Sequence, residues 1–189
     1  MEDADVNLKN PNIEISTTYY GNGCTPGAGS TKPCQTRLVT TQDDEIQKNG
    51  TYYNFQAATA GSGASLTADN AQASDTFCPL GWQLPYGGTD GDYYNQSKSW
   101  IGFLNSYELT NNTSSSQTLR SYPISYVMSG GLDMWSGKLY NQGQSGMYHS
   151  PSNADSNHDY RYIFGTAWII ITRDDLVITK HYGYPVRCN

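Results

Sequence analysis

The chain has 189 residues, of which 37% are hydrophobic and 15% charged, and its formal net charge is −6. That length suits one well-packed domain, and the acidic balance excludes a basic surface for the phosphate backbone of nucleic acids. No apolar stretch approaches the roughly 20 residues of a membrane-spanning helix. We therefore expect no direct insertion into a membrane, and the acidic start at 1–5 suggests that any leader or anchor lies upstream.

The first part of the chain, residues 1–37, is polar and predicts an N-terminal extension made of a strand and a hairpin. Residues 38–189 form the expected main domain, in which Asn49-Gly50 is a strong hairpin-turn dipeptide. Short runs of β-branched and aromatic residues bounded by turn residues predict strands. The expected strands lie at 37–40, 51–57, 124–128, 160–164, 167–172 and 176–182.

Two helices are expected in the first half of the domain. Thr67 is a candidate N-cap of a short helix that ends at Ala73, and Asp92 is a candidate N-cap of a longer one. In the longer helix one face would carry Tyr93, Ser97, Trp100, Ile101 and Leu104. The polar stretch 111–117 predicts a loop, and 173–175 predicts the turn of a hairpin. Helices early and strands late in one domain predict an α+β fold with short antiparallel strands.

The four cysteines are Cys24, Cys34, Cys78 and Cys188, an even number without a CxxC motif or a Cys/His cluster. Three disulfide pairings are possible. The most economical joins Cys24 to Cys34 across a Pro/Gly-rich turn and Cys78 to Cys188 over a long loop. Disulfides indicate an oxidising, extracellular or cell-surface location. The alternative is four buried thiols in a cytosolic protein.

Five segments occur in the order and spacing of a known family: 50–59, 78–85, 119–123, 146–148 and 183–188. The most specific are the motif CPLGWQLP at 78–85 and the ending GYPVRC at 183–188. Over residues 38–189 the chain resembles the Fibrobacter succinogenes major paralogous domain. The resemblance implies a C-type-lectin-like fold that is disulfide-bridged and loop-rich.

Some relatives in that family are surface or pilin-like proteins. Others are the variable proteins of diversity-generating retroelements, in which the codons of a C-terminal segment are mutated to give many ligand-binding faces on one scaffold. The family usually has a Gly-Tyr-Tyr-Trp-Ser-Ser-Thr-like stretch where this chain reads GMYHSPS at 146–152, so His149 stands in place of the tryptophan. Targeted variation and ordinary drift both account for that change.

A ligand-binding face is expected within about residues 135–182, which contain all three histidines and many Tyr, Asn and Asp residues. Aromatic side chains give large contact area at low conformational cost, and Asn, Ser and Asp add adaptable hydrogen bonds. The alternative is that Tyr162 and Trp168 belong to the core and the polar residues to a solvated loop. The expected contributors, most of them exposed, are Tyr140, Tyr148, His149, Asn153, Asp155, Asn157, His158, Tyr162, Trp168, Arg173 and His181.

Residues around the long-range cysteine pair are assigned to the scaffold rather than to the site. Trp82 is the expected core anchor beside the disulfide. Arg187 is expected to pair with a carboxylate or with backbone carbonyl groups rather than with a ligand. Pro85 and Tyr122 are assigned to the same scaffold.

Motifs for catalysis and for metal binding are scarce. Oxygen-bearing side chains alternate through 153–159 as in a calcium loop, but the glycine and the distal glutamate of an EF-hand are missing. Calcium-dependent sugar binding is therefore the weaker option. The sequence has no HExxH motif, P-loop or nucleophile elbow. We expect no catalytic residue, no resident metal and no cofactor.

Together these patterns predict an extracytoplasmic binding module of adhesin or receptor type. Its expected ligand is a protein or a cell-surface glycan. The alternative is a structural subunit, pilin-like or from a surface layer, that contacts copies of itself.

Overall fold

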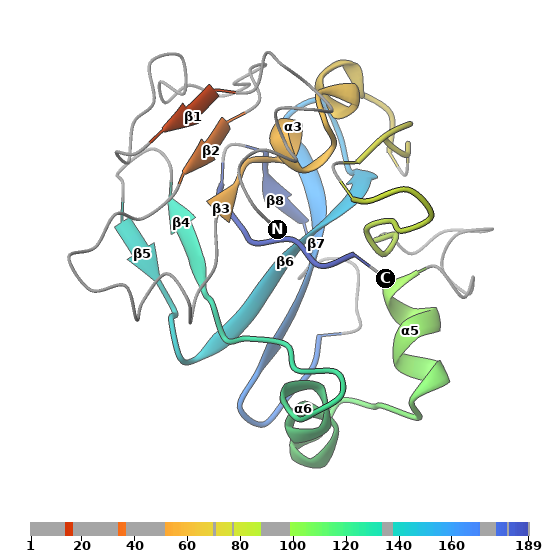
Figure 1. Cartoon of the computed structure of the whole chain (residues 1–189), viewed down its shortest axis with the longest axis vertical. Helices are drawn as coiled ribbons and strands as arrows, with labels where there is room; N and C mark the ends of the chain where they lie inside the picture. Colours follow the sequence, from red (N-terminus) through yellow and green to blue (C-terminus); the bar gives the residue numbers. More distant parts are fainter. Residues whose placement is uncertain are drawn as a thin grey trace.

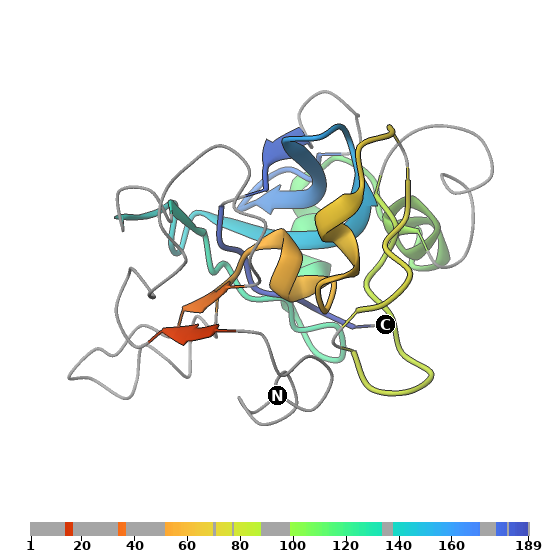
Figure 2. The ribbon, with the colours of Figure 1, turned by 90° about the horizontal axis from the view of Figure 1, so that it is seen from above.

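The computed structural model (Figures 1 and 2) gives the arrangement of the chain around one long β-hairpin. For 14–16 and 34–36 only the backbone is described. The residues that the structure describes are 14–16, 34–36, 52–69, 71–76, 78–87, 99–133, 138–170, 177–180 and 182–188.

Two long antiparallel strands, β6 (Ser145–Asn153) and β7 (His158–Gly165), cross the middle of the molecule (Figure 1). Their register shifts between His149 and Asn153. β8 (Val177–Thr179) pairs antiparallel with the first half of β7 and completes a three-stranded sheet. Every residue of β6 is buried, so this strand is the centre of the core.

Two smaller sheets lie beside the hairpin. In the first, β1 (Glu14–Ser16) pairs parallel with β2 (Cys34–Thr36), which pairs antiparallel with β3 (Tyr52–Tyr53). In the second, β4 (Gly131–Asp133) pairs antiparallel with β5 (Lys138–Tyr140). Strands from residues 1–37 thus share a sheet with the first strand of the main segment.

The α-helices are short and begin at polar caps, whereas the 3-10 helix follows Gly61 without a side-chain cap. The side chains of Asn54, Ser99 and Asn112 each accept a hydrogen bond from a backbone N–H of the first turn, which satisfies a donor that the helix itself leaves unpaired. The helices are α3 (Phe55–Ala58), the 3-10 helix η1 (Ser62–Ser65), α5 (Trp100–Ser106) and α6 (Thr113–Arg120).

Several predicted elements differ from the structure. The strand expected at 51–57 ends after Tyr53, because Asn54 caps α3. The helix expected from Thr67 is absent, since residues 67–69 and 71–73 are irregular and Gln72 forms an isolated bridge to Ser152. The strand expected at 124–128 is also irregular.

The helix with Trp100 and Leu104 is present, but Ser99 is its cap and Asp92 lies outside the described residues. The expected loop at 111–117 is instead the start of α6, because Asn112 caps it and Leu119 is fully buried against the core.

Other predictions are confirmed or fall on residues that are not described. The strand expected at 160–164 is confirmed within β7, and that at 176–182 is confirmed in shortened form as β8. The strand at 167–172 is reduced to an isolated bridge between Ile169 and Phe164 in its described part. The elements outside the described residues are the strand at 37–40, the turn at 49–50, the turn at 173–175 and Cys24, hence its pairing with Cys34.

The core contains a stack of aromatic rings along the hairpin. Trp100 stacks on Tyr162 with ring centroids 4.5 Å apart, and Tyr162 stacks on Tyr148 at 5.5 Å. Tyr126 meets the Tyr148 ring edge-on at 5.0 Å. Such contacts add to the stabilisation from burial alone, so these rings fix α5 and the loop after α6 against β6 and β7.

A second part of the core surrounds the disulfide, where Cys78, Leu84 and Ala57 are fully buried. The predicted bond between Cys78 and Cys188 is confirmed, with Cα atoms 5.8 Å apart and a sequence separation of 110 residues. It joins the last described segment to the middle of the chain.

The predicted fold class is confirmed at the level of a mixed α+β protein with short, mostly antiparallel strands and few helices. Among the described residues, none of the helices has the length and apolar character needed to cross a membrane.

Candidate functional site

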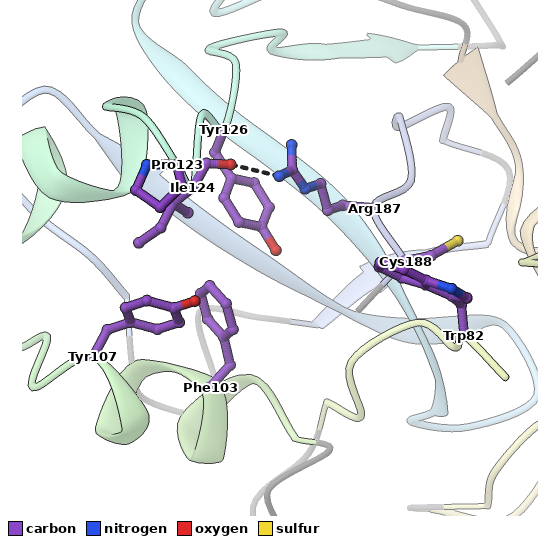
Figure 3. A pocket seen from close by; sticks show the side chains of 8 residues that line it. All are labelled: Trp82, Phe103, Tyr107, Pro123, Ile124, Tyr126, Arg187 and Cys188. Atoms are coloured by element: carbon purple, nitrogen blue, oxygen red, sulfur yellow. Dashed lines mark hydrogen bonds between the residues drawn. The ribbon is translucent and has the colours of Figure 1, made fainter.

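A surface pocket of about 290 Å³ lies between the disulfide and the loop that follows α6 (Figure 3). In the close-up Trp82 and Cys188 stand on one side, opposite Pro123, Ile124, Phe103 and Tyr107. The pocket is lined by Trp82, Phe103, Tyr107, Pro123, Ile124, Tyr126, Arg187 and Cys188.

The Trp82 wall is built by a tight turn. The Trp82 N–H donates to the Pro79 carbonyl at 2.9 Å, and Gly81 in the third position of the turn has a φ of +86°. Such a φ is what a type II turn requires of its third residue, and glycine adopts it without strain. Cys78 before the turn and Leu84 after it are buried, so the turn is anchored at both ends and projects outward.

The opposite wall comes from α5 and the loop 121–127. Phe103 in α5 and Tyr107, which follows the end of α5, are four residues apart and lie on the same side, with ring centroids 5.2 Å apart. The loop is tied to α6 because the Tyr126 N–H donates to the Leu119 carbonyl at 2.9 Å. The Tyr148 hydroxyl accepts from the Val127 N–H and donates to its carbonyl, both at 2.9 Å. This wall is thus held in place before any ligand binds.

Arg187 supplies the one charged side chain among the residues that line the pocket. Its Nη2 donates to the Ile124 carbonyl at 2.5 Å and its Nη1 to the Ser125 carbonyl at 3.4 Å. The guanidinium also lies 4.8 Å from the centroid of the Tyr126 ring, within cation–π range. The prediction that Arg187 pairs with backbone carbonyl groups is confirmed.

The Tyr126 side chain forms part of the pocket wall (Figure 3). It is 3% exposed, and its hydroxyl oxygen lies inside the protein. Burial raises the pKa of Tyr126 well above its usual value, although the nearby Arg187 charge acts in the opposite direction, so the group remains a donor. A hydrogen bond with the Tyr162 side chain also lowers the pKa of Tyr126. The Tyr162 hydroxyl donates its own proton to the Arg187 carbonyl at 3.5 Å.

Exposed apolar side chains gather around this pocket. Trp82 and Tyr107 line it, Leu80 belongs to the Trp82 turn, and Tyr122 and Val127 belong to the opposite loop. We call these five residues the pocket rim. They are the large hydrophobic side chains that are exposed in the described part of the chain: Leu80 102%, Trp82 58%, Tyr107 48%, Tyr122 92% and Val127 43%.

Two residues of the pocket rim, Trp82 and Tyr122, were assigned to the scaffold from the sequence, and both assignments are wrong. Trp82 is not a core anchor, because the turn that carries it faces outward while the neighbouring Cys78 is buried. Tyr122 is also exposed rather than packed in the scaffold. Pro85 is buried, as a scaffold residue should be.

Four residues predicted to form the ligand-binding face lie in the core instead. Tyr148, His149 and Asn153 belong to β6 and Tyr162 to β7, and none of them is more than 4% exposed. The prediction that His149, Asn153 and Tyr162 are exposed is therefore wrong. Tyr148 and Tyr162 stack with Trp100 behind the pocket, which confirms the alternative of a core role for Tyr162.

His149 is buried because its neighbours satisfy both ring nitrogens. Nδ1 lies 2.9 Å from Asp159 Oδ2, and Nε2 lies 2.7 Å from the Tyr53 carbonyl oxygen. Asn153 is buried for a related reason: its Nδ2 donates to the Ala68 carbonyl at 2.7 Å. Polar side chains in β6 thus hold distant segments of the chain together.

The remaining predicted residues are dispersed. Asp155, Asn157 and His158 lie in or beside the β6–β7 turn, where Asp155 accepts hydrogen bonds from the backbone of the other two at 2.7 and 2.9 Å. Tyr140 and Trp168 are partly buried against the hairpin sheet. Arg173 and His181 lie outside the described residues.

Sequence reasoning missed the pocket because its lining comes from segments far apart in the chain. The exposed Trp82 has one local signal, since Pro79, Leu80 and Gly81 before it form a turn. Among the described residues, no three His, Cys, Asp or Glu side chains are grouped as metal ligands. Comparison with protein families, with curated proteins and with solved structures finds no match for the chain.

Proposed function

We propose that the protein is an extracytoplasmic ligand-binding module of adhesin or receptor type, with a C-type-lectin-like fold, and that its ligand binds at the pocket and its rim. The observation that carries the proposal is the gathering of exposed apolar side chains around one pocket. Large exposed apolar side chains grouped beside a pocket are typical of interaction sites in soluble proteins. A soluble protein with no partner would bury these side chains or disperse them.

The proposed location outside the cytoplasm rests on the Cys78–Cys188 disulfide. Structural disulfides persist in oxidising compartments and are rare in the cytosol. Because Cys188 lines the pocket and Cys78 anchors the Trp82 turn, the same bond supports one wall of the site.

Diversification by a retroelement remains a separate proposal. In the described part of residues 135–182, positions that tolerate frequent change are exposed ones such as Gln144 and 155–157, not the enclosed strand β6. Sequencing the DNA around the gene tests this proposal: a near-repeat of the C-terminal segment beside a reverse transcriptase gene would support it, and their absence would contradict it.

The binding function is tested with a rim variant, Trp82→Ser with Tyr122→Ser, and a control variant, Gln144→Ser with Ala167→Ser. Both pairs of residues are exposed, but only the first belongs to the rim. The oxidised proteins are immobilised and exposed to an array of cell-surface glycans and to a library of peptides. We expect saturable binding that the rim variant loses and the control keeps. No saturable binding, or binding that the rim variant keeps, would contradict the proposal.

The alternative of a structural subunit predicts a different result for the same variants. Self-association at the rim would give a sedimentation coefficient that rises with protein concentration in the unmodified and control proteins but not in the rim variant. A module that binds another molecule would sediment as a monomer throughout.

A further inference from the structure

The chemistry of the pocket lining also indicates what kind of ligand it takes, an inference that rests on the function proposed above. We propose that the site binds an internal segment of a partner polypeptide, which places a large apolar side chain such as phenylalanine in the pocket and one acidic side chain on Arg187.

The side chains of the lining can donate hydrogen bonds but offer few acceptors. Among the eight lining residues there is no Asp, Glu, Asn, Gln, Ser or Thr, and Arg187 and Trp82 donate only. Hydroxyl oxygens come from Tyr107, which is half exposed, and from Tyr126, whose oxygen is buried. The many hydroxyls of a saccharide would find few acceptors here, and a hydroxyl removed from water without a partner is costly. A polypeptide fits the lining better, because an apolar side chain needs no acceptor at all.

Arg187 is held in place before a ligand arrives. Its Nη2 and Nη1 donate to the carbonyl groups of Ile124 and Ser125, and the guanidinium lies 4.8 Å from the centroid of the Tyr126 ring. In the described part of the chain its Nε has no partner and is not enclosed, so this donor stays open to a ligand. A side chain that is ordered in advance loses little conformational entropy on binding.

The acidic side chain of the partner follows from charge complementarity. Arg187 is the one charged residue among the lining and the pocket rim, and no carboxylate pairs with it in the described part of the chain. A carboxylate accepts from the N–H groups of an arginine in a matching geometry. The chain as a whole has a net charge of −6, so a run of acidic residues would be repelled. One acidic residue in an otherwise uncharged segment therefore suits the site.

The apolar anchor follows from the size and the walls of the pocket. Its volume of about 290 Å³ lies at the small end of ligand pockets, which typically span roughly 300–1,000 Å³. The rings of Trp82 and Tyr107 line it and are half exposed, so an inserted ring can pack against them. Aromatic side chains that fill such pockets contribute most of the binding energy in many protein interfaces.

The segment is internal because exposed apolar side chains continue past the pocket on two sides. Leu80 belongs to the Trp82 turn, and Tyr122 precedes Pro123 in the opposite wall; both are almost fully exposed. A partner chain that runs on in both directions from its anchor would cover them. A chain that ended at the anchor would cover one side alone.

The test uses short peptides, capped at both ends, in a Gly/Ser host with Phe-Glu, Phe-Gln, Phe-Lys or Ser-Glu at the centre. Binding is followed by the shift of the Trp82 indole N–H in NMR spectra of the 15N-labelled, oxidised protein, assigned with Trp82→Phe. We expect Ser-Glu to bind at least about tenfold more weakly than Phe-Glu, because it has no ring to bury. We expect Phe-Gln to be weaker than Phe-Glu by up to about fivefold, and Phe-Lys to be the weakest of the three peptides with phenylalanine. The advantage of Phe-Glu over Phe-Gln should shrink in about 1 M salt.

Arg187→Gln should abolish the difference between Phe-Glu and Phe-Gln. The variant also loses its hydrogen bonds to the opposite wall, so all peptides can weaken together, and the ratio of the two affinities is therefore the quantity compared. Arg120→Gln is the matched control, because it removes the same charge at the end of α6, outside the lining. It should preserve the difference.

Equal binding of Phe-Glu and Phe-Lys to the unmodified protein, a preference for Phe-Glu that survives Arg187→Gln, or no shift at millimolar peptide would overturn the inference. Ser-Glu that binds as tightly as Phe-Glu would also overturn it. Rim-dependent binding of a glycan without binding of Phe-Glu would overturn it and leave the binding function intact. Peptide binding that the rim variant retains would overturn both.

Discussion

The buried pair of His149 and Asp159 allows a direct test of how much a buried ionisable pair contributes to the stability of the fold. Both side chains are fully buried, and the ring bridges the Asp159 carboxyl group and the Tyr53 carbonyl. Because the carbonyl can only accept, the ring donates to it from Nε2 and shares a second proton with the carboxyl group through Nδ1. We expect His149→Phe to lower the free energy of unfolding by about 3–5 kcal/mol at neutral pH, since it leaves a buried carboxylate without its partner.

Most of that loss of stability comes from the Asp159 carboxyl group, which loses its hydrogen-bond partner. The Tyr53 carbonyl keeps a hydrogen bond from the Tyr184 N–H at 2.9 Å, whereas Oδ1 of Asp159 already lacks a partner in the described part of the chain. Replacing both members of a buried pair by apolar residues is often neutral or stabilising. We therefore expect the double variant with Asp159→Leu to be more stable than His149→Phe alone by about 1–4 kcal/mol.

The loss of stability caused by His149→Phe should also depend on pH. Burial raises the pKa of Asp159, and the hydrogen bond and charge of His149 oppose that rise. Without His149 the pKa rises further, while the unfolded chain releases its proton at the ordinary carboxyl pKa. Between the two pKa values the folded variant binds more protons than the unfolded chain, so its stability falls as the pH rises.

Urea unfolding of the oxidised proteins, followed by tryptophan fluorescence at about pH 5 and pH 8, measures these effects. The cost of His149→Phe should be smaller at the lower pH. A cost below about 1 kcal/mol, an equal cost at both pH values, or a double variant no more stable than the single one would refute the reasoning.

Three further predictions concern the fold. Replacing Cys78 and Cys188 by alanine should cost up to about 4.8 kcal/mol in urea unfolding, the entropy of a loop of 110 residues; an unchanged midpoint would show that the bond contributes nothing. Gly146→Ala should cost about 1–3 kcal/mol, because its Cβ would collide with the Phe164 ring, and a thermal midpoint equal to that of the unmodified protein would contradict this. Asp155→Asn should cost roughly 0.2–1 kcal/mol at neutral pH. Desolvation would raise the pKa of Asp155, but hydrogen bonds donated by the β6–β7 turn lower it. The contribution of Asp155 to the free energy of unfolding should therefore disappear as the pH falls through the lowered pKa. Unfolding measured across the acid range would test this.

Local patterns predicted some features correctly because short-range chemistry determines them. β7 contains two tyrosines, an isoleucine and a phenylalanine, and its 160–164 part was expected as a strand. The Cys78–Cys188 bond followed from the even number of cysteines and the local Cys24–Cys34 turn. The mixed fold class followed from the order of helical and strand patterns.

Other features depend on distant partners that no local pattern reveals. β6 contains His, Ser, Pro and Asn, which suggested an exposed loop. It is buried because its polar groups have internal partners, such as the Ser150 hydroxyl that donates to the Tyr160 carbonyl at 2.7 Å. The pocket was missed for a related reason: Trp82 and Tyr126 are 44 positions apart and meet only in the folded chain. Its position beside the disulfide also placed Trp82 inside, since that position does not report which way the turn faces.

The enclosure of β6 limits how this protein can change over generations. Each side chain of the strand is surrounded by others, so most substitutions there disturb several neighbours at once. Descendants of this gene would accept mutations more readily at the β6–β7 turn and around the mouth of the pocket than along the central strand. New specificities would therefore arise at the periphery, while the middle of the hairpin stays nearly constant.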